Sequence, residues 1–520
     1  MRSAGSKPLV QLRKTDPSWR STLWLITLSL IAACAWALVF SRYFLEQKPR
    51  LAGGLSEVQL QGLTEQWLGF YQGDSPIGYN HLVIEPRGNE YFMTDEMVLR
   101  VNLLGQVNEM RLFMKGRLDM DWTIQSLDFD LSSEGLSFSA RAQRVNNLMK
   151  IIIRTGGERL EREISLNQPP YLYTEPVLAE KLRQQGIKPG LKLSVPVFEP
   201  LTQSFDLVNL EVQERERVKL AKGEVDAFKV SESFRQQTEY LWITETGEVV
   251  KEWHPSGFTA LKIDRDTALN LLTSEGTGLN PDLISALSVP SDRYIENSRQ
   301  VKFLKLRIKG AKLDGLDLDG DGQKLSGRTL EILGAEVPES SYALPFSGDL
   351  DMEKYLKPDW QVQSDSEGIV SQAREIVGSE KDSVKATAML VQWVSRYVED
   401  SLVVSIPSAL EVLKSRRGAC KEHTVLFTAL ARSAGIPARM VAGLVYSDAY
   451  LIKGFYYHAW AEVYLTDEDG KNGRWVRVDP TFNQFPADAT HIRLKIGNLE
   501  DMLSLMQVVG QTRIEVIEYQ

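Results

Sequence analysis

Residues 418–423 read GACKEH, residues 457–460 read YHAW and residues 475–480 read WVRVDP. These three stretches place one cysteine, two histidines and one aspartate in the C-terminal third of the chain. A cysteine that attacks a carbonyl must ionise to the thiolate, and both a helix N-terminus and a nearby imidazolium favour that form. We therefore interpret Cys420 as a nucleophile, His458 as its base and Asp479 as the acid that orients the base.

Local patterns assign these residues to one helix and two strands. Gly418 disfavours regular secondary structure just before Cys420. Apolar residues then recur at helical spacing up to a stop signal at 435–437. This pattern predicts a helix that begins at the cysteine. The alternating aromatic residues 455–465 predict one strand, and residues 474–478 predict another. A thiol at the helix tip would then face an imidazole and a carboxylate on adjacent strands, which suits thiol acyl transfer.

The same residues resemble the transglutaminase-like superfamily, whose members share a papain-like fold. The resemblance rests on the glycine before the cysteine, LARSAGIPAR at 430–439, HAW at 458–460 and VDPTF at 478–482, and it covers roughly residues 370–520. It implies Cys420 as nucleophile, His458 as general base and Asp479 as the orienting acid. Relatives often carry an acid where this chain has Ala419, and the loss of a carboxylate beside the thiol should ease ionisation.

Further side chains could line this site. The candidates are His423, Tyr457, Trp460, Glu462 and His491. His423 follows Cys420 by three positions, so a zinc site of Cys420, His423, His458 and Asp479 is an alternative. We do not favour it, because short paired ligand motifs are missing and a thiol at a helix tip needs no metal. The expectation is no cofactor and no metal.

Length and composition bound the architecture. The 520 residues are 43% hydrophobic and 25% charged, which suffices for several globular cores. We predict a multidomain α+β protein with a single N-terminal transmembrane helix, an antiparallel, half-barrel-like β-meander domain and a C-terminal papain-like, transglutaminase-like α+β domain. The net charge of −9 gives no reason to expect nucleic acid. Cys34 and Cys420 are the two cysteines, which excludes a disulfide framework.

The N-terminal sequence predicts a membrane anchor. Residues 23–40 form an unbroken apolar or small-residue run, about 27 Å long as a helix, and basic residues dominate before it. The positive-inside rule then predicts a cytoplasmic tail at 1–20, a signal-anchor helix at 21–43 and a periplasmic or other extracytoplasmic remainder, a single-pass arrangement in the cell (inner) membrane. Lipoprotein processing at Cys34 is the alternative, but the run stays apolar beyond it.

Three regions follow the anchor. Residues 57–274 alternate between strand patterns and tight turns, which predicts a β-rich extracytoplasmic domain that either holds an acyl chain or peptide or acts as a spacer. Residues 275–365 predict a middle segment with a linker, and residues 366–520 the transglutaminase-like domain. Residues 317–322 resemble the start of a calcium loop, but Arg328 stands where the twelfth position needs an acid, so we expect a solvated turn.

These features predict a membrane-anchored, extracytoplasmic cysteine acyltransferase or peptidase. Cys420 would attack an amide of a peptide, a protein or peptidoglycan to form a thioester, which water would hydrolyse or an amine would aminolyse. Besides this substrate, the expected partner is the membrane, bound through the N-terminal helix, and not nucleic acid. The alternatives are a non-catalytic cell-envelope scaffold and a lipid- or peptide-binding protein, because a fold does not fix a function.

Overall fold

The computed structural model describes residues 64–520, with gaps inside that range. The gaps are 104–105, 134–135, 156–157, 201–203, 235–236, 273–281, 283, 285–286, 402–407, 451, 468–471, 498–504, 506–507 and 509. The predicted cytoplasmic tail, the predicted anchor helix at 21–43 and the alternative processing site at Cys34 lie outside the described residues. The predicted cellular location therefore stays a prediction.

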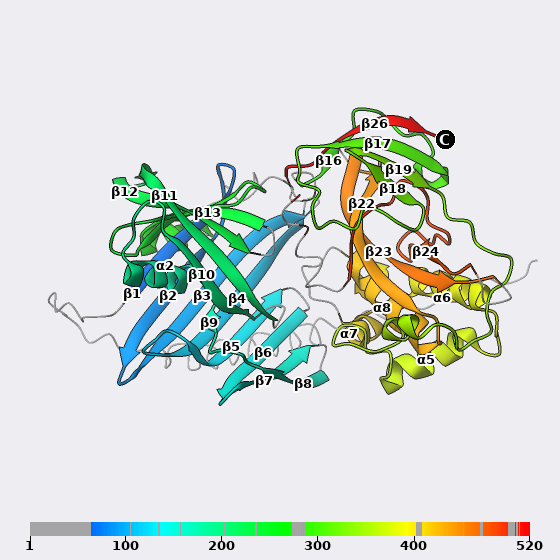
Figure 1. The fold of residues 1–520 in the computed structure, drawn as a ribbon, viewed down its shortest axis with the longest axis horizontal. Coiled ribbons are helices and arrows are strands. Elements are labelled where there is room, and N and C mark those ends of the chain that lie inside the picture. The colour runs from blue at the N-terminus through cyan, green and yellow to red at the C-terminus, as the bar shows by residue number, and fades with distance from the viewer. Residues whose placement is uncertain are drawn as a thin grey trace, which may run out of the picture. The chain divides into compact units, whose positions relative to one another are not determined.

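A 15-stranded sheet forms the first part of the described chain (Figure 1). Its order is β8-β7-β6-β5-β4-β3-β2-β1-β15-β14-β13-β12-β11-β10-β9, and the neighbours pair antiparallel except β9 with β10. The strands are β1 (Thr64–Gln72), β2 (Ser75–Arg87), β3 (Glu90–Leu103), β4 (Gln106–Asp119), β5 (Ile124–Ser133), β6 (Leu136–Val145), β7 (Leu148–Thr155), β8 (Glu158–Ser165), β9 (Tyr171–Leu172), β10 (Lys192–Glu199), β11 (Ser204–Leu220), β12 (Gly223–Phe234), β13 (Gln237–Ile243), β14 (Val249–Trp253) and β15 (Phe258–Lys262).

Alternating side chains give this sheet its buried face. In β5, Leu127 and Phe129 are buried whereas Asp128 between them is exposed, because successive side chains of a strand point to opposite faces. The first hairpin turns at Gly73, whose φ of 59° glycine adopts without a Cβ clash. Helix α2 (Glu175–Gln185) adds buried side chains to one of the cores, and α3 (Arg265–Leu271) packs on β1 and β2.

The fold-class prediction needs correction. Strands make up 50% of the structure and helices 19%, so the protein is mostly β and not the α+β protein that we predicted. Long strands account for the difference, since β11 alone has 17 residues. Within the described residues no helix combines the length and the apolar character needed to cross a bilayer, so the predicted transmembrane helix is not shown.

The middle segment and the C-terminal region share their sheets. A five-stranded sheet has the order β16-β23-β22-β25, with β24 beside β23, and a four-stranded sheet has the order β18-β19-β17-β26. Described residues of the 275–365 segment thus supply strands to both sheets. The strands are β16 (Val289–Pro290), β17 (Phe303–Lys309), β18 (Gln323–Ser326), β19 (Thr329–Leu333), β22 (Ala438–Ser447), β23 (Gly454–Leu465), β24 (Arg474–Val478), β25 (Ile492–Ile496) and β26 (Arg513–Tyr519), and β20 (Glu399–Asp400) pairs with β21 (Arg417–Gly418).

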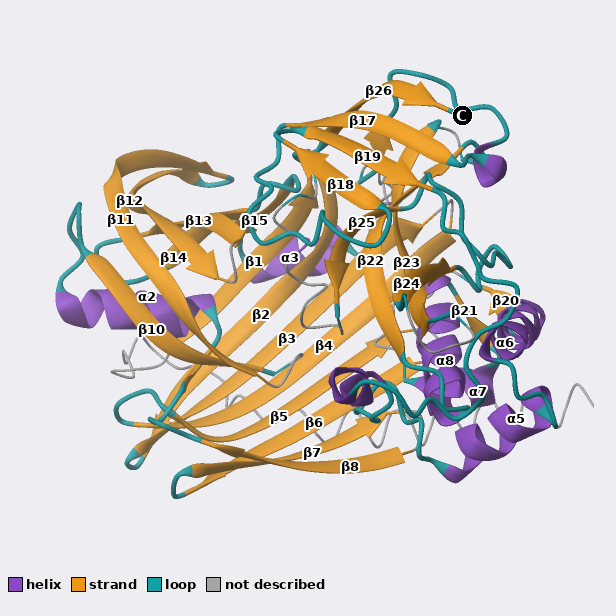
Figure 2. Ribbon diagram, turned by 45° about the vertical axis from the view of Figure 1, so that its right-hand side comes forward, coloured by secondary structure: helices purple, strands orange, loops and turns teal. Residues whose placement is uncertain are grey.

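Helix α8 (Cys420–Ser433) is the centre of the helical layer (Figure 2). Its residues from Glu422 to Ala431 are all buried. The surrounding helices α5 (Glu367–Val377), α6 (Ser383–Tyr397) and α7 (Ala409–Ser415) each contact it, as do β22 and β23. Short 3-10 helices lie at Ser298–Gln300 and Leu350–Tyr355. This packing fixes the N-terminal end of α8 beside the five-stranded sheet.

Candidate active site

The first turn of α8 holds Cys420. The helix begins at this residue, as the sequence predicted. Ala419 precedes it and has no side chain that could cap the helix, but the Glu422 carboxylate accepts a hydrogen bond from the N–H of Ala419 at 2.8 Å. The Glu422 side chain also explains Gly418, because a Cβ there would lie 2.2 Å from the Cβ of Glu422. Cys420, a residue that is half-buried, therefore places its thiol where the helix dipole favours the anion.

Strands β23 and β24 bring His458 and Asp479 together. His458 lies in β23, Asp479 directly follows β24, and the two strands pair antiparallel. The Nε2 atom of His458 is 2.8 Å from Oδ2 of Asp479. Oδ1 of the fully buried Asp479 accepts hydrogen bonds from the N–H groups of Thr481 and Phe482 at 2.8 and 3.2 Å. The carboxylate is thus fixed from both of its oxygens.

The ionisation of Cys420 is coupled to that of His458 through a hydrogen bond and Coulombic attraction. Because Nε2 of His458 faces Asp479, Nδ1 is the ring nitrogen available to the thiol. Burial by itself would raise the pKa of Cys420, but His458 and the N–H of Ala459 outweigh it and lower the pKa below its ordinary value, while Glu422 acts in the opposite direction.

The same coupling favours the imidazolium form of His458. Burial opposes the charged ring, but the Asp479 carboxylate and the Cys420 thiolate together raise the pKa of His458 to about 10. Burial would also raise the pKa of Asp479, yet the attraction and hydrogen bonds of His458 and His491 lower it far below its ordinary value. These electrostatics favour a thiolate–imidazolium pair at neutral pH.

A second series of polar side chains supports the Asp479 carboxylate. His491 is fully buried, and its Nε2 atom lies 2.9 Å from Oδ2 of Asp479. Its Nδ1 atom lies 3.1 Å from the backbone oxygen of Asp488, and the Asp488 carboxylate pairs with Arg299 at 3.1 Å. The guanidinium of Arg299 lies over the Phe482 ring, 4.6 Å from its centroid. His491, Asp488 and Arg299, which come from two distant parts of the chain, therefore support one carboxylate oxygen.

The ring of Phe482 also stacks on His458. Their centroids are 5.0 Å apart with an interplanar angle of 11°. Phe482 is 39% exposed, so it forms a surface wall of the site. Tyr450 is another neighbour, because burial and the nearby Cys420 charge both raise its pKa. The sequence analysis did not single out Phe482, Arg299 or Asp488. Phe482 could have been found, because it lies within the VDPTF motif that supports the resemblance.

The other predicted lining residues lie behind or away from the thiol. His423 is buried and its Nδ1 atom is 2.9 Å from the backbone oxygen of Ala419. Trp460 is fully buried, with its ring edge-on to His491 at 5.2 Å. Tyr457 alternates to the opposite side of β23 from His458 and packs in a separate core. The structure therefore places His491 and Trp460 in contact with the triad residues and leaves Tyr457 elsewhere.

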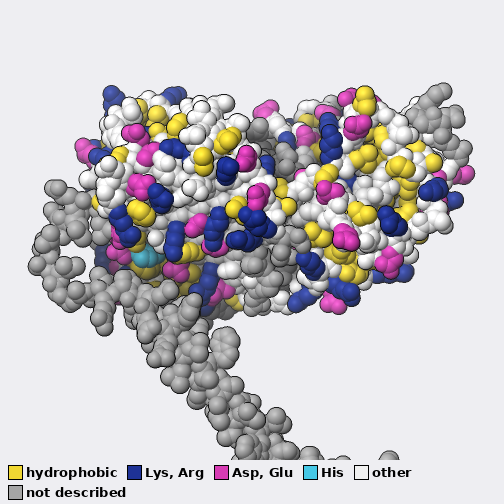
Figure 3. Space-filling model, turned by 90° about the horizontal axis from the view of Figure 1, so that it is seen from below, with side chains coloured by type: hydrophobic (Ala, Val, Ile, Leu, Met, Phe, Trp, Pro, Cys, Tyr) yellow, Lys and Arg dark blue, Asp and Glu magenta, His cyan; other side chains and the backbone are white. Residues whose placement is uncertain are grey.

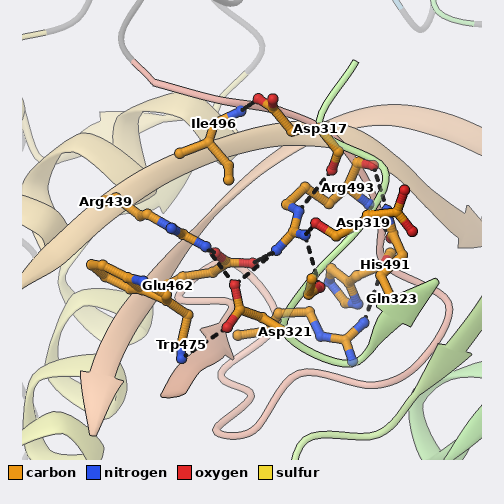
Figure 4. A network of polar contacts seen from close by, with 12 residues as sticks. Asp317, Asp319, Asp321, Gln323, Arg439, Glu462, Trp475, His491, Arg493 and Ile496 are labelled. Carbon is orange, nitrogen blue, oxygen red and sulfur yellow. Dashed lines mark hydrogen bonds and ion pairs between the residues drawn. The ribbon is translucent and has the colours of Figure 1, made fainter. Parts of the chain in front are cut away.

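Glu462 belongs to a buried ionic network rather than to the site wall (Figure 4). Its carboxylate accepts a hydrogen bond from Arg439 at 2.7 Å and pairs with Arg493 at 3.3 Å. Both arginines also pair with Asp321, at 3.0 and 3.5 Å, and Arg493 donates to the backbone oxygen of Asp319 at 2.7 Å. Residues 317–322, which resemble the start of a calcium loop, are therefore held against the sheet by guanidinium groups. We had expected a solvated turn there.

One group of side chains could hold a metal ion. The ligand atoms of His458, Asp479 and His491 all lie within 4.8 Å of one another. This set differs from the zinc alternative of the sequence, because His491 replaces Cys420 and His423. The same atoms already form the hydrogen bonds described above, at 2.8 and 2.9 Å. These hydrogen bonds therefore explain the close approach of the three side chains without a metal ion.

The C-terminal part of the chain thus brings together a cysteine at a helix tip, a histidine on β23 and an aspartate directly after β24. Residues 370–480 match the model of the Transglutaminase-like superfamily, so the predicted transglutaminase-like domain in the C-terminal part is confirmed.

Solved structures share weaker likeness with the chain. A candidate cysteine protease from Cytophaga hutchinsonii has 17% identity and a TM-score of 0.27, with coverage of 42% of this chain and 89% of that one. A β-barrel-like protein from Brucella abortus has 11% identity and a TM-score of 0.28, with coverage of 38% and 94%. The periplasmic domain of TgpA from Pseudomonas aeruginosa has 16% identity and a TM-score of 0.22, with coverage of 36% and 89%. TM-scores this low support no functional assignment. No curated protein matches the sequence.

Proposed function

We propose that the transglutaminase-like domain is a thiol acyltransferase or hydrolase that acts on amides of peptides or proteins, with Cys420, His458 and Asp479 as its catalytic triad. One observation carries this proposal. The thiol of Cys420, a half-buried residue, is coupled to His458, and Asp479 holds the other nitrogen of that ring at 2.8 Å. A nucleophile, a base and an orienting acid in this order form the working arrangement of cysteine acyl transfer.

The reaction begins with attack of the Cys420 thiolate on the amide carbonyl. The new C–S bond pushes the carbonyl electrons onto oxygen, and the backbone N–H of Cys420, in the first turn of α8, donates to that oxyanion. The intermediate collapses when the C–N bond breaks and Nδ1 of His458 gives its proton to the departing amine. A thioester on Cys420 and a neutral imidazole remain.

The thioester then reacts with water or with an amine. The attacking molecule forms a bond to the thioester carbon and gives a proton to Nδ1 of His458, and the C–S bond breaks to restore the thiolate. Asp479 stabilises the imidazolium at both stages and keeps the ring in place. Water yields a carboxylic acid and an amine yields a new amide, so the same three residues serve hydrolysis and transfer.

Trapping the thioester tests this function. The full chain carrying Cys34→Ser is incubated with an unfolded protein substrate and hydroxylamine, and mass spectrometry counts the hydroxamates and cleaved or deamidated sites. We expect products with the Cys34→Ser protein and none when Cys420→Ala is added, while the unfolding midpoint stays almost unchanged. His81→Gln, which changes a histidine of β2, is the matched control and should keep full activity.

A different result would overturn the proposal. If the Cys420→Ala protein keeps its activity, Cys420 is not the nucleophile. If no substrate acylates Cys420 and its thiol ionises at the ordinary pKa near 8.5, the domain is a binding module instead.

A further inference from the structure

The large sheet encloses a cavity of about 280 Å³ that is separate from the triad. Strands β1–β3 and β13–β15 contribute to its walls, and α2, which Figure 2 shows beside the curved strands, contributes Glu175 and Pro176. Trp253 lines the cavity and is 36% exposed, so the cavity reaches the surface there. All of these lining residues come before residue 263 in the chain.

Four carboxyl groups contribute to the polar lining of this cavity. Asp95, Glu175, Glu239 and Glu252 line it, and among the described lining residues none is Lys or Arg. The outer surface differs, because acidic and basic side chains are interspersed on the face that Figure 3 shows. Like charges that gather in a hollow repel one another, and burial lowers the pKa of the lining His254, which disfavours its charged form. Such a lining is suited to a bound cation.

Glu232 supplies the second, independent observation. It is 1% exposed, and neither of its carboxylate oxygens has a partner at ordinary hydrogen-bond geometry, although the nearby Tyr173 hydroxyl opposes part of the rise that burial causes in its pKa. It stands directly opposite Glu239 in the register of β12 and β13, so the two side chains project from the same face of the sheet. A buried carboxyl group without a partner costs free energy, and a donor in the adjoining cavity would remove that cost.

The ionisation of these groups agrees with a site for a cation. Burial raises the pKa of Asp95 to about 7, and the Asn80 hydrogen bond only partly opposes it. Burial and the charge of Glu175 raise the pKa of Glu239 to about 7. Burial and the surrounding acids also hold the pKa of Glu252 well above its ordinary value. A bound cation would reverse these shifts, because opposite charge favours the ionised carboxylates.

The remaining lining distinguishes an organic cation from a metal ion. Among the described residues, His458, Asp479 and His491 are the one group of three or more ligand side chains that could hold a metal ion, and the cavity acids form no such group. The other lining side chains are largely apolar or aromatic, namely Leu68, Phe70, Leu82, Met97, Trp253 and Phe258. Apolar walls accommodate a hydrocarbon chain, and aromatic faces attract an ammonium group.

We propose that this cavity binds an aliphatic amine, with the ammonium group held by the Glu239 and Glu252 carboxylates and the hydrocarbon chain against the apolar wall. The ligand class is a primary alkylamine or diamine, either free or as the side chain of a basic residue. This site is independent of the proposed acyl-transfer function, because it shares no residue with the triad.

Calorimetric titration of the full chain with 1,5-diaminopentane tests the proposal. We expect saturable binding to the unchanged protein and at least about tenfold weaker binding to Glu239→Gln and to Glu252→Gln, because each variant loses a charge-assisted hydrogen bond. Both variants remove repulsion between acids, so their unfolding midpoints should not fall. Glu224→Gln, which changes an exposed acid of the same sheet, should bind as the unchanged protein does.

Other outcomes would overturn the amine site. These are no detectable binding of the diamine, equal binding by the cavity variants, or saturable binding of calcium ion or decanoate that Glu252→Gln abolishes. Calcium binding would show a metal site, and decanoate binding would show a lipid site.

Discussion

His491 and His458 contact the same carboxylate oxygen, Oδ2 of Asp479, at 2.9 and 2.8 Å. The aspartate therefore lies between two imidazole rings, and the backbone N–H groups of Thr481 and Phe482 hold its other oxygen. This arrangement leaves the carboxylate little freedom to rotate. His491 thus positions His458 through Asp479 without contact with the thiol.

The first prediction concerns His491. His491→Gln should leave Cys420 reactive but loosen Asp479, since the amide cannot reproduce both contacts of the imidazole. We expect the rate constant for alkylation of Cys420 by iodoacetamide at pH 7 to fall about tenfold, and the midpoint of its pH profile to move upward. His81→Gln should change neither value.

A purely structural role for His491 would give another result. Stability would fall, but the pH midpoint of alkylation would stay in place. Measuring both quantities on the same samples separates the two cases.

The second prediction concerns the ionisation of the thiol. Because His458 lowers the pKa of Cys420, alkylation should reach half its plateau below the ordinary value near pH 8.5. In His458→Gln the burial of the thiol is no longer opposed by an imidazolium, so the midpoint should rise to 8.5 or above. The protein carries Cys34→Ser for this measurement, so that the alkylation rate reports on Cys420 alone. A midpoint that does not respond to His458→Gln would contradict the coupling.

The third prediction concerns the Glu462 network. Glu462→Gln leaves the buried guanidinium groups of Arg439 and Arg493 with less counter-charge, and we expect a loss of about 3 kcal/mol in the free energy of unfolding. Glu515→Gln, which breaks exposed pairs with Arg307 and Lys309, should cost less than about 1 kcal/mol. Equal losses in urea denaturation would argue against a buried ionic network.

Calcium should not act on this network. Asp321 pairs with Arg439, and Asp319 accepts a hydrogen bond from the N–H of Leu325 at 2.8 Å. We therefore expect the same unfolding midpoint with calcium chloride and with a chelator. A clear upward shift with calcium would revive the loop as a metal site.

The fourth prediction concerns acid. Burial would raise the pKa of Asp488, but His491 and Arg299 hold it well below its ordinary value. A lowered pKa gives stability that is complete above the unfolded value near 3.9 and is lost as pH falls toward the folded value. The free energy of unfolding should therefore decline below about pH 4, and Asp488→Asn should decline less steeply. Asp226→Asn, at an exposed position, should follow the unchanged protein. Parallel acid curves for all three proteins would contradict the role of Asp488.

The sequence by itself determined the local parts of the site. Helical spacing after Gly418 located the start of α8, and alternation located the strand of His458, because both patterns arise between residues that are near in the chain. The ordered motifs also identified the family of residues 370–480. Local pattern did not give the overall proportion of strand, which depends on how far each strand extends through pairing with its neighbours.

Only the tertiary structure decided which distant residues meet. Arg299 reaches Asp488 from 189 positions earlier in the chain, and no local period relates them. Glu224 and Glu232 lie in the same strand and have the same side-chain chemistry, yet the first is exposed and the second is buried. The sequence alone predicts that both are exposed, because burial of a carboxyl group depends on the elements that pack over it. Long-range packing therefore set both the support behind Asp479 and the acidic cavity.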